Sequence, residues 1–120
     1  MKNVILDTDF LIHSLKFRIS IKEELSRVCD FPFVAGVLDK TLEELQGKPL
    51  EKLAKAYIEK ELTIFKTSCD KPADDLLLFQ TGAVIATDDK ELKERLKKAN
   101  FPIISIRQKK YYHLENVLSN

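Results

Sequence analysis

The chain has 120 residues, of which 44% are hydrophobic and 32% are charged. A chain of this length can bury a core of its own, and we expect residues 1–120 to form a single domain. The formal net charge of +1 provides no overall basic field of the kind that marks many nucleic-acid-binding proteins. No apolar run approaches the roughly 20 residues that a membrane-spanning helix requires. Two cysteines without CxxC or Cys/His spacing argue against a zinc site and favour a reduced, cytoplasmic protein.

Short apolar runs alternate with amphipathic helical patterns along the chain. In chain order, the predicted strands are residues 4–6, 33–38, 62–65, 83–86 and 102–106. Helices are predicted from residue 20 to 28, 38 to 47, 49 to 58, 72 to 81 and 89 to 99, and a polar tail begins at Arg107. This alternation predicts an α/β fold, with a five-stranded parallel sheet between two helical layers. Ligands of such sheets bind beyond the carboxyl ends of the strands.

Acidic residues follow four of the predicted strands. They are Asp7 and Asp9, Glu43 and Glu44, Asp74 and Asp75, and Asp88 and Asp89. Carboxylates that meet at one sheet edge repel one another, and a divalent cation removes that repulsion. Oxygen ligands without His or Cys favour Mg²⁺ or Mn²⁺. A cation held in this way can activate water against a phosphodiester.

Each acidic pair also has an ordinary explanation. Asp88 or Asp89 is suited to capping a helix, and Asp74 with Asp75 would favour the first turn of another. Glu43 and Glu44 would suit a solvated helix face. Asp7 is the strongest candidate, because Thr8 or Asp9 is available to cap the helix that follows it.

The order of the motifs VILDTDFL, LDKTLEELQG, ADDLLL, AVIATDDKEL and FPIISIRQKKYYHLENV resembles the PIN domain. The likeness extends over essentially the whole chain. It is greatest to the archaeal and eukaryotic branch that includes the small-subunit-processome endonuclease of pre-rRNA processing. The resemblance implies a metal-dependent ribonuclease with a three-layer α/β/α fold and strand order 3-2-1-4-5. It also implies hydrolysis that leaves a 5′-phosphate, and the family often forms homodimers.

By this resemblance the catalytic acids would fall on Asp7, Glu44, Asp75 and Asp89. The Mg²⁺ or Mn²⁺ ligands would be Asp7, Asp75 and Asp89, with Asp74 and Asp88 as further candidates, and the supporting residues would be Asp9, Thr87 and Glu43. Two choices stay open, Glu43 against Glu44 and Asp74 against Asp75.

The sequence departs from the family pattern at two of these positions. The family commonly has Asn where this chain has Asp9 and Asp88. Each change adds a negative charge beside an expected ligand. We therefore expect a strained metal-free site that binds its cation tightly.

Basic residues supply the expected contacts to RNA. Arg107, Lys109 and Lys110 follow the fifth strand at the same predicted edge and are candidates for phosphate contact. Several lysines of the preceding helix have i,i+4 acidic partners and need no other explanation.

We consider three alternatives. A response-regulator receiver would need a phospho-accepting Asp at the end of the third strand, near mid-chain. Residues 50–60 contain no Asp, which argues against a receiver. A toxin-type PIN ribonuclease with an antitoxin partner has the same motifs. So does an RNA-binding PIN scaffold without activity.

Overall fold

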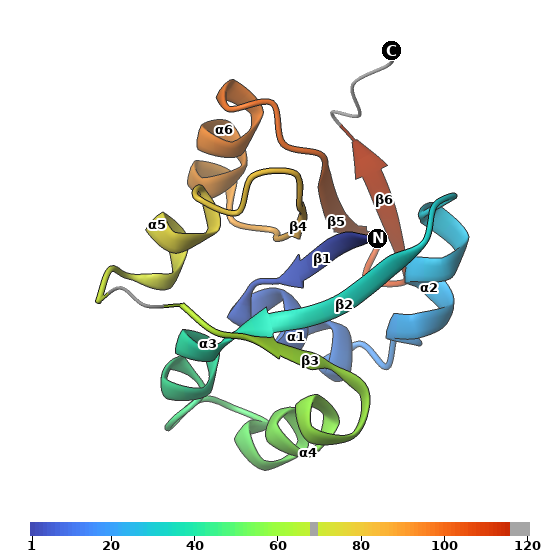
Figure 1. The fold of residues 1–120 in the computed structure, drawn as a ribbon. Coiled ribbons are helices and arrows are strands. Elements are labelled where there is room, and N and C mark those ends of the chain that lie inside the picture. The colour runs from blue at the N-terminus through green and yellow to red at the C-terminus, as the bar shows by residue number, and fades with distance from the viewer. Residues whose placement is uncertain (68–69, 116–120) are drawn as a thin grey trace.

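The computed structural model describes residues 1–67 and 70–115, which form an α/β fold (Figure 1). One sheet contains the strands β1 (Lys2–Leu6), β2 (Phe33–Leu38), β3 (Thr63–Phe65), β4 (Val84–Ala86), β5 (Ile103–Arg107) and β6 (Tyr111–Glu115). The helices of the described residues are α1 (Thr8–Lys16), α2 (Ile21–Val28), α3 (Asp39–Glu44), α4 (Glu51–Glu61), α5 (Ala73–Leu77) and α6 (Lys90–Lys98). No helix in these ranges is both long enough and apolar enough to cross a membrane.

The strand order is β3-β2-β1-β4-β5-β6. The first five strands pair in parallel, which confirms the predicted α/β fold and the order 3-2-1-4-5. β1 lies between β2 and β4, so residues that follow β1 lie at the middle of the sheet edge. The arrowheads of β1 and β2 point toward the side on which α3 and α5 lie (Figure 1).

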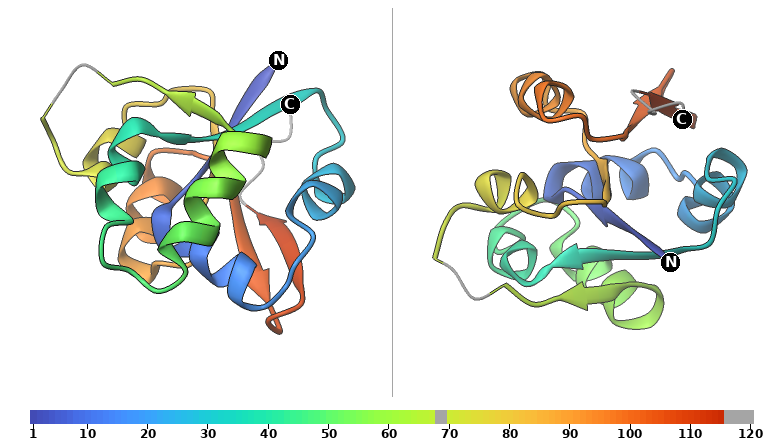
Figure 2. Two further views of the ribbon diagram at one scale, coloured as in Figure 1. Left: turned by 90° about the horizontal axis from the view of Figure 1, so that it is seen from below. Right: turned by 45° about the horizontal axis from the view of Figure 1, so that its top comes forward.

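Two helical layers cover the sheet, and the alternation of side chains along the strands explains why (Figure 2). Val4, Leu6, Val84 and Ala86 face one way and pack in one core with residues of α1, α2 and α4. Ile5, Ile85 and Ile103 face the other way and pack with residues of α5 and α6. Strands buried on both faces read as continuous apolar runs, which is the pattern of the sequence.

The sixth strand was not predicted, and the expectation of a polar tail from Arg107 is wrong. β6 pairs antiparallel with β5, from Arg107 opposite Tyr111 to Ile103 opposite Glu115. The connecting turn has positive φ at Gln108 and Lys109, where glycine or asparagine would have signalled a hairpin. The sequence therefore lacks the usual turn signal.

A single buried tyrosine anchors β6. Tyr112 is 1% exposed, and its ring lies 4.9 Å from that of Phe10 on α1. Its hydroxyl shares a 2.6 Å hydrogen bond with Ser14 Oγ, and its backbone N–H donates to Glu24 on α2. Tyr112 thus joins the added strand to two helices of one layer.

We expect Tyr112→Phe to lower the free energy of unfolding by about 1–3 kcal/mol, because it leaves the buried Ser14 hydroxyl without this partner. Ser14→Ala combined with Tyr112→Phe should cost less than the two single changes added together. Urea denaturation of the four proteins measures both quantities. A Tyr112→Phe protein as stable as the wild type would show that the hydrogen bond between Tyr112 and Ser14 does not stabilise the fold.

Candidate functional site

Three acidic residues and two threonines lie beyond the carboxyl ends of β1, β2 and β4. Asp7 and Thr8 follow β1, and Thr87 and Asp89 follow β4. Glu44, at the end of α3, reaches the same group from the segment after β2. Three of the predicted acids, Asp7, Glu44 and Asp89, therefore belong to one hydrogen-bonded network with these threonines.

Asp7 is the buried acid of this group, with 9% of its surface exposed. Its Oδ1 accepts a 2.9 Å hydrogen bond from the Thr8 N–H, and its Oδ2 accepts one of 3.0 Å from the Thr87 hydroxyl. Asp7 is also the N-cap of α1, so the expectation that Thr8 or Asp9 caps this helix is wrong. The cap fixes the direction in which the carboxylate leaves the strand.

Thr87 connects Asp7 to Asp89. The Thr87 side chain is fully buried, and its Oγ1 accepts a 3.2 Å hydrogen bond from the Asp89 N–H while donating to Asp7. Asp89 in turn caps α6, because its Oδ1 accepts a 2.9 Å bond from the Leu92 N–H. One buried hydroxyl therefore connects the Asp7 carboxylate to the Asp89 backbone, while the Asp89 carboxylate is oriented by its helix cap.

Thr8 makes the matching connection to Glu44. Its hydroxyl donates to Glu44 Oε1 and lies 3.2 Å from the Thr41 hydroxyl. Glu43 lies outside this network, and its carboxylate is 3.6 Å from Lys40 Nζ with 72% of its side chain exposed. Of the two glutamates that sequence periodicity left open, Glu44 contacts Thr8 and Glu43 contacts Lys40, and both residues are exposed.

The acids of α5 are arranged differently. Asp75 forms an ion pair with Arg95 on α6, in which Asp75 Oδ1 lies 2.8 Å from Arg95 Nη2. Both side chains are partly exposed. This contact links α5 to α6 and does not reach Asp7. The side chain of Asp74, the competing candidate, lies outside the part of the chain that the structure describes.

The two departures from the family pattern have compensating partners. Asp9 Oδ1 lies 3.0 Å from Lys48 Nζ, and Asp88 Oδ1 accepts a 2.9 Å hydrogen bond from the Ile106 N–H. Asp88 thereby ties the loop after β4 to β5. Both added acids therefore have partners, and the expected strain and tight cation binding stay predictions.

Lys48 brings a positive charge to the rim of the group. Its hydrogen bond to Asp9 is the largest cause of a raised pKa, and the charges of Glu44 and Asp7 raise the pKa further. The Lys48 ammonium is therefore within electrostatic range of both acids. Its side chain is 41% exposed and remains accessible from solvent.

The donor chemistry fits a hard divalent cation. The network contains carboxylate and hydroxyl oxygens but no imidazole or thiolate, which favours Mg²⁺ or Mn²⁺ over zinc. Among side chains that the structure describes, no three Asp, Glu, His or Cys residues converge closely enough to form a complete set of ligands. Asp7, Glu44 and Asp89 are instead bridged by threonines.

The predicted RNA contacts lie on the β5–β6 hairpin, at the carboxyl end of β5. Arg107 is 3.9 Å from Glu115, and Lys109 Nζ lies 5.7 Å from the centre of the Phe17 ring. Lys110 is exposed. All three residues are exposed, and Lys109 lies beside the end of α1 that is remote from Asp7.

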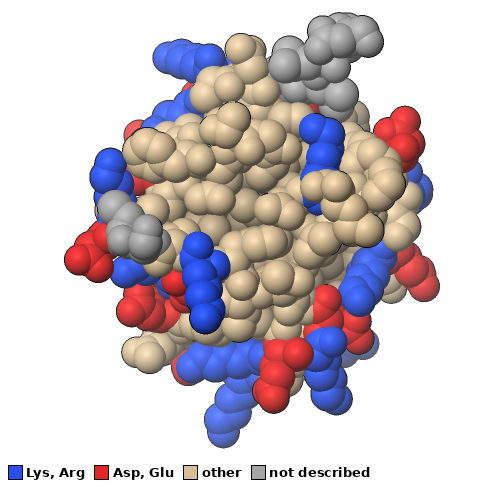
Figure 3. Space-filling view, viewed as in Figure 1, with Lys and Arg blue, Asp and Glu red and all other residues tan. Residues whose placement is uncertain are grey.

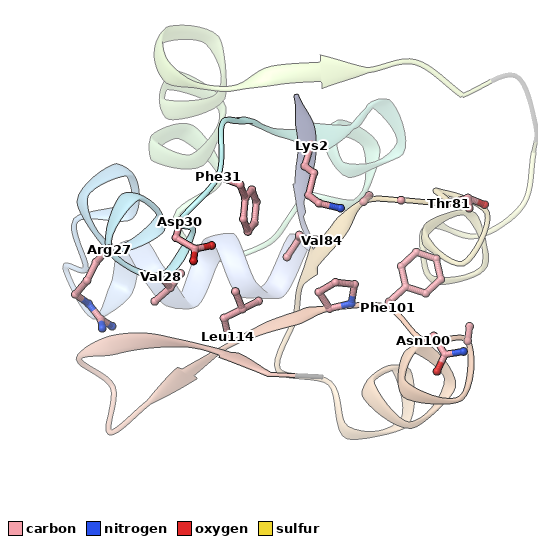
Figure 4. A pocket seen from close by; sticks show the side chains of 14 residues that line it. Lys2, Arg27, Val28, Asp30, Phe31, Thr81, Val84, Asn100, Phe101 and Leu114 are labelled. Atoms are coloured by element: carbon pink, nitrogen blue, oxygen red, sulfur yellow. The ribbon is translucent and has the colours of Figure 1, made fainter. Parts of the chain in front are cut away.

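Two further features of the surface lie apart from the acidic network. On the face seen in Figure 3, charged side chains of both signs surround a broad uncharged middle. A cavity of about 700 Å³ lies near the amino ends of β1, β4 and β5, with Lys2, Phe31, Val84 and Phe101 in its lining (Figure 4). It is therefore at the edge opposite Asp7.

Sequence reasoning missed three residues of the network. Thr8 contacts Glu44, Thr41 contacts Thr8, and Lys48 contacts Asp9. Thr8 adjoins Asp7 in the chain, and the Asp-Thr pair could have suggested its role. Lys48 had no local signal, since its partner is 39 residues away.

The acidic network lies at the carboxyl edge of the sheet, where α/β proteins with parallel strands bind their ligands. Comparison with known proteins identifies the family to which this chain belongs. Residues 4–109 match the PIN-like domain, and the chain belongs to this family. Family membership excludes the receiver alternative.

Individual relatives agree with this assignment. The chain is 32% identical over 127 residues to ribonuclease VapC4 of Methanocaldococcus jannaschii, covering 95% of this chain and 97% of the relative. It also resembles the solved structure of the PIN domain endonuclease Utp24, with a TM-score of 0.82 and 22% identity. That match covers 98% of this chain and 96% of the other, and it establishes a shared fold.

The Thr87 hydroxyl gives a direct test of the network. We expect Thr87→Val to lower the free energy of unfolding by about 1–3 kcal/mol, because Asp7 loses a donor and the Asp89 N–H loses an acceptor. Thr87→Ser keeps the hydroxyl and should recover most of that loss. Equal stability of the Val and Ser variants in urea denaturation would show that the bonds contribute nothing.

Proposed function

We propose that this protein is a metal-dependent endoribonuclease whose active site is the acidic network around Asp7. The observation that carries the proposal is a buried strand-end carboxylate joined through Thr8 to Glu44 and through Thr87 to Asp89, in a chain of the PIN-like family. The name of the relative, ribonuclease VapC4, supports RNA as the substrate.

In this proposal Asp7 and Asp89 hold Mg²⁺ or Mn²⁺, and Glu44 contributes directly or through water. Asp75 is proposed as a further ligand, which requires its contact with Arg95 to loosen. Asp74 and Asp88 stay candidates of lower rank, since Asp88 already accepts from a backbone N–H. Asp9 is proposed to support the site through its charge, whereas Glu43, paired with Lys40, would contribute only a weak, solvent-screened charge from outside the network.

When bound, the cation would supply the acidity that activates water and the positive charge that stabilises a phosphorane-like transition state. The residues of this chain contribute orientation. Thr87 would orient the carboxylate of Asp7 and Thr8 that of Glu44, while the Leu92 N–H would orient that of Asp89, so little rearrangement would accompany substrate binding. Hydrolysis would leave a 5′-phosphate on the product. No dedicated general base is assigned.

The cellular role is proposed from the sequence. The sequence resemblance described above supports rRNA processing or RNA turnover in the cytoplasm as the role, with single-stranded RNA or an rRNA precursor bound through Arg107, Lys109 and Lys110. A homodimer is proposed by family analogy. The toxin-type alternative would use the same residues, and growth arrest on expression that a neighbouring gene product relieves would favour it.

We expect the protein to cut end-labelled, partly single-stranded RNA in the presence of Mn²⁺ and to stop cutting when EDTA is added. Asp7→Asn should abolish cutting, because the amide cannot balance the charge of a cation. The variant should stay folded, since Asn retains an acceptor for Thr8 N–H and a polar partner for Thr87.

The matched measurement is thermal unfolding with and without Mn²⁺. The wild-type melting temperature should rise by several degrees with Mn²⁺ through preferential binding to the folded state. Asp7→Asn should melt normally without Mn²⁺ and lose that rise. Metal-independent cutting, or cutting that persists in Asp7→Asn, would contradict the proposed site.

The two neighbouring glutamates offer a further test. We expect Glu44→Gln to reduce the Mn²⁺ shift in melting temperature, because its carboxylate lies in the network. The cleavage rate of this variant should fall by about ten-fold or more. Glu43→Gln removes the same charge one residue away and should leave both within about two-fold. Equal losses in the two variants would show that only total charge matters.

A further inference from the structure

A lysine lies at the rim of the acidic site, and the proposed metal chemistry does not use its charge. Lys48 lies in the turn between α3 and α4, and its Nζ is 3.0 Å from Asp9 Oδ1. The charges of Glu44 and Asp7 also act on this ammonium.

The turn that carries Lys48 is fixed by several backbone contacts. The Lys48 N–H donates to Leu45 O at 3.0 Å, and the Lys48 carbonyl accepts from the Glu51 N–H at 3.3 Å. The Gly47 N–H donates to Glu51 Oε1 at 3.0 Å, and Leu45 is fully buried. The backbone of Lys48 therefore has a defined position at the rim, from which its flexible side chain reaches the acidic site.

The charges around Lys48 show what kind of ligand it suits. Asp9 is its direct partner, and Asp7 and Glu44 contribute to the field that acts on it. Asp9 is exposed, with 61% of its side chain accessible, so the pair is open to exchange with another anion. An exposed ion pair of this kind is worth little by itself, and a phosphate oxygen can replace the carboxylate at small cost.

We propose that Lys48 is a substrate-positioning residue that exchanges Asp9 for a phosphate of single-stranded RNA beside the scissile bond. This inference rests on the proposed ribonuclease function. In the absence of RNA, Asp9 holds the ammonium on the rim. When RNA binds, Lys48 aligns the backbone without acting on the reacting atoms.

The test is binding of a short fluorescein-labelled single-stranded RNA in EDTA, followed by anisotropy over a range of salt concentrations. Lys48→Gln should weaken binding by about five-fold and reduce the slope of log K against log salt by about 0.7, the value for one phosphate contact on a single strand. Lys48→Arg keeps the charge and should bind within about two-fold of the wild type. Lys60→Gln is the matched control, because Lys60 is an exposed lysine in the last turn of α4, before β3 begins at the opposite sheet edge.

Asp9→Asn separates positioning from a structural role. It breaks the same ion pair, yet it frees Lys48 and removes an anion, so RNA binding should tighten or stay unchanged. If Asp9→Asn weakens RNA binding as much as Lys48→Gln, the ion pair is structural and the inference is overturned. Circular dichroism of each variant verifies that it is folded.

Metal binding and kinetics complete the test. Lys48→Gln should bind Mn²⁺ as tightly as the wild type or more tightly, because it removes a positive charge near Asp7 and Glu44. Its KM for RNA should rise while kcat stays within about two-fold. Wild-type cutting with unchanged RNA affinity in Lys48→Gln would overturn only this inference. A wild-type protein that neither cuts nor binds RNA would overturn the proposed function as well.

Discussion

The carboxylate of Asp7, buried at the carboxyl end of the central strand, is the constraint around which the edge of this sheet is organised. An ionised group in such a place requires hydrogen bonds, because burial of an uncompensated charge costs several kcal/mol. The chain supplies them from the Thr8 N–H and the Thr87 hydroxyl. Both donors come from segments that directly follow parallel strands, so the sheet topology itself delivers them. The same two threonines then reach Glu44 and Asp89.

Charge balance at this edge is distributed among different kinds of partner. Asp89 caps a helix, Asp88 accepts from a backbone N–H, and Asp9 meets Lys48. Asp75 meets Arg95. These contacts allow a folded chain to carry many acids close together before any cation binds. They also rank the acids, since one in contact with lysine or arginine must give up that contact to bind a metal.

The sequence was most informative where a structural rule connects neighbouring residues. Apolar runs such as Val4–Leu6 identified buried parallel strands, and the acids that follow them were expected at one edge because parallel strands end together. The choice between Glu43 and Glu44 required the structure, because both flank the same leucine stripe and only the side-chain contact with Thr8 separates them. β6 was missed because Gln108 and Lys109 adopt left-handed backbone conformations without glycine. Lys48 was missed because its partner is distant in the chain.

The proposed function requires that the threonine-linked acids form a cation site for phosphodiester hydrolysis. Anomalous diffraction from crystals of the protein soaked in Mn²⁺ would locate that cation. We expect a Mn²⁺ peak in direct contact with the Asp7 carboxylate and close to Asp89, with Glu44 in contact directly or through a water. Crystals that bind Mn²⁺ only away from Asp7, or not at all, would contradict it.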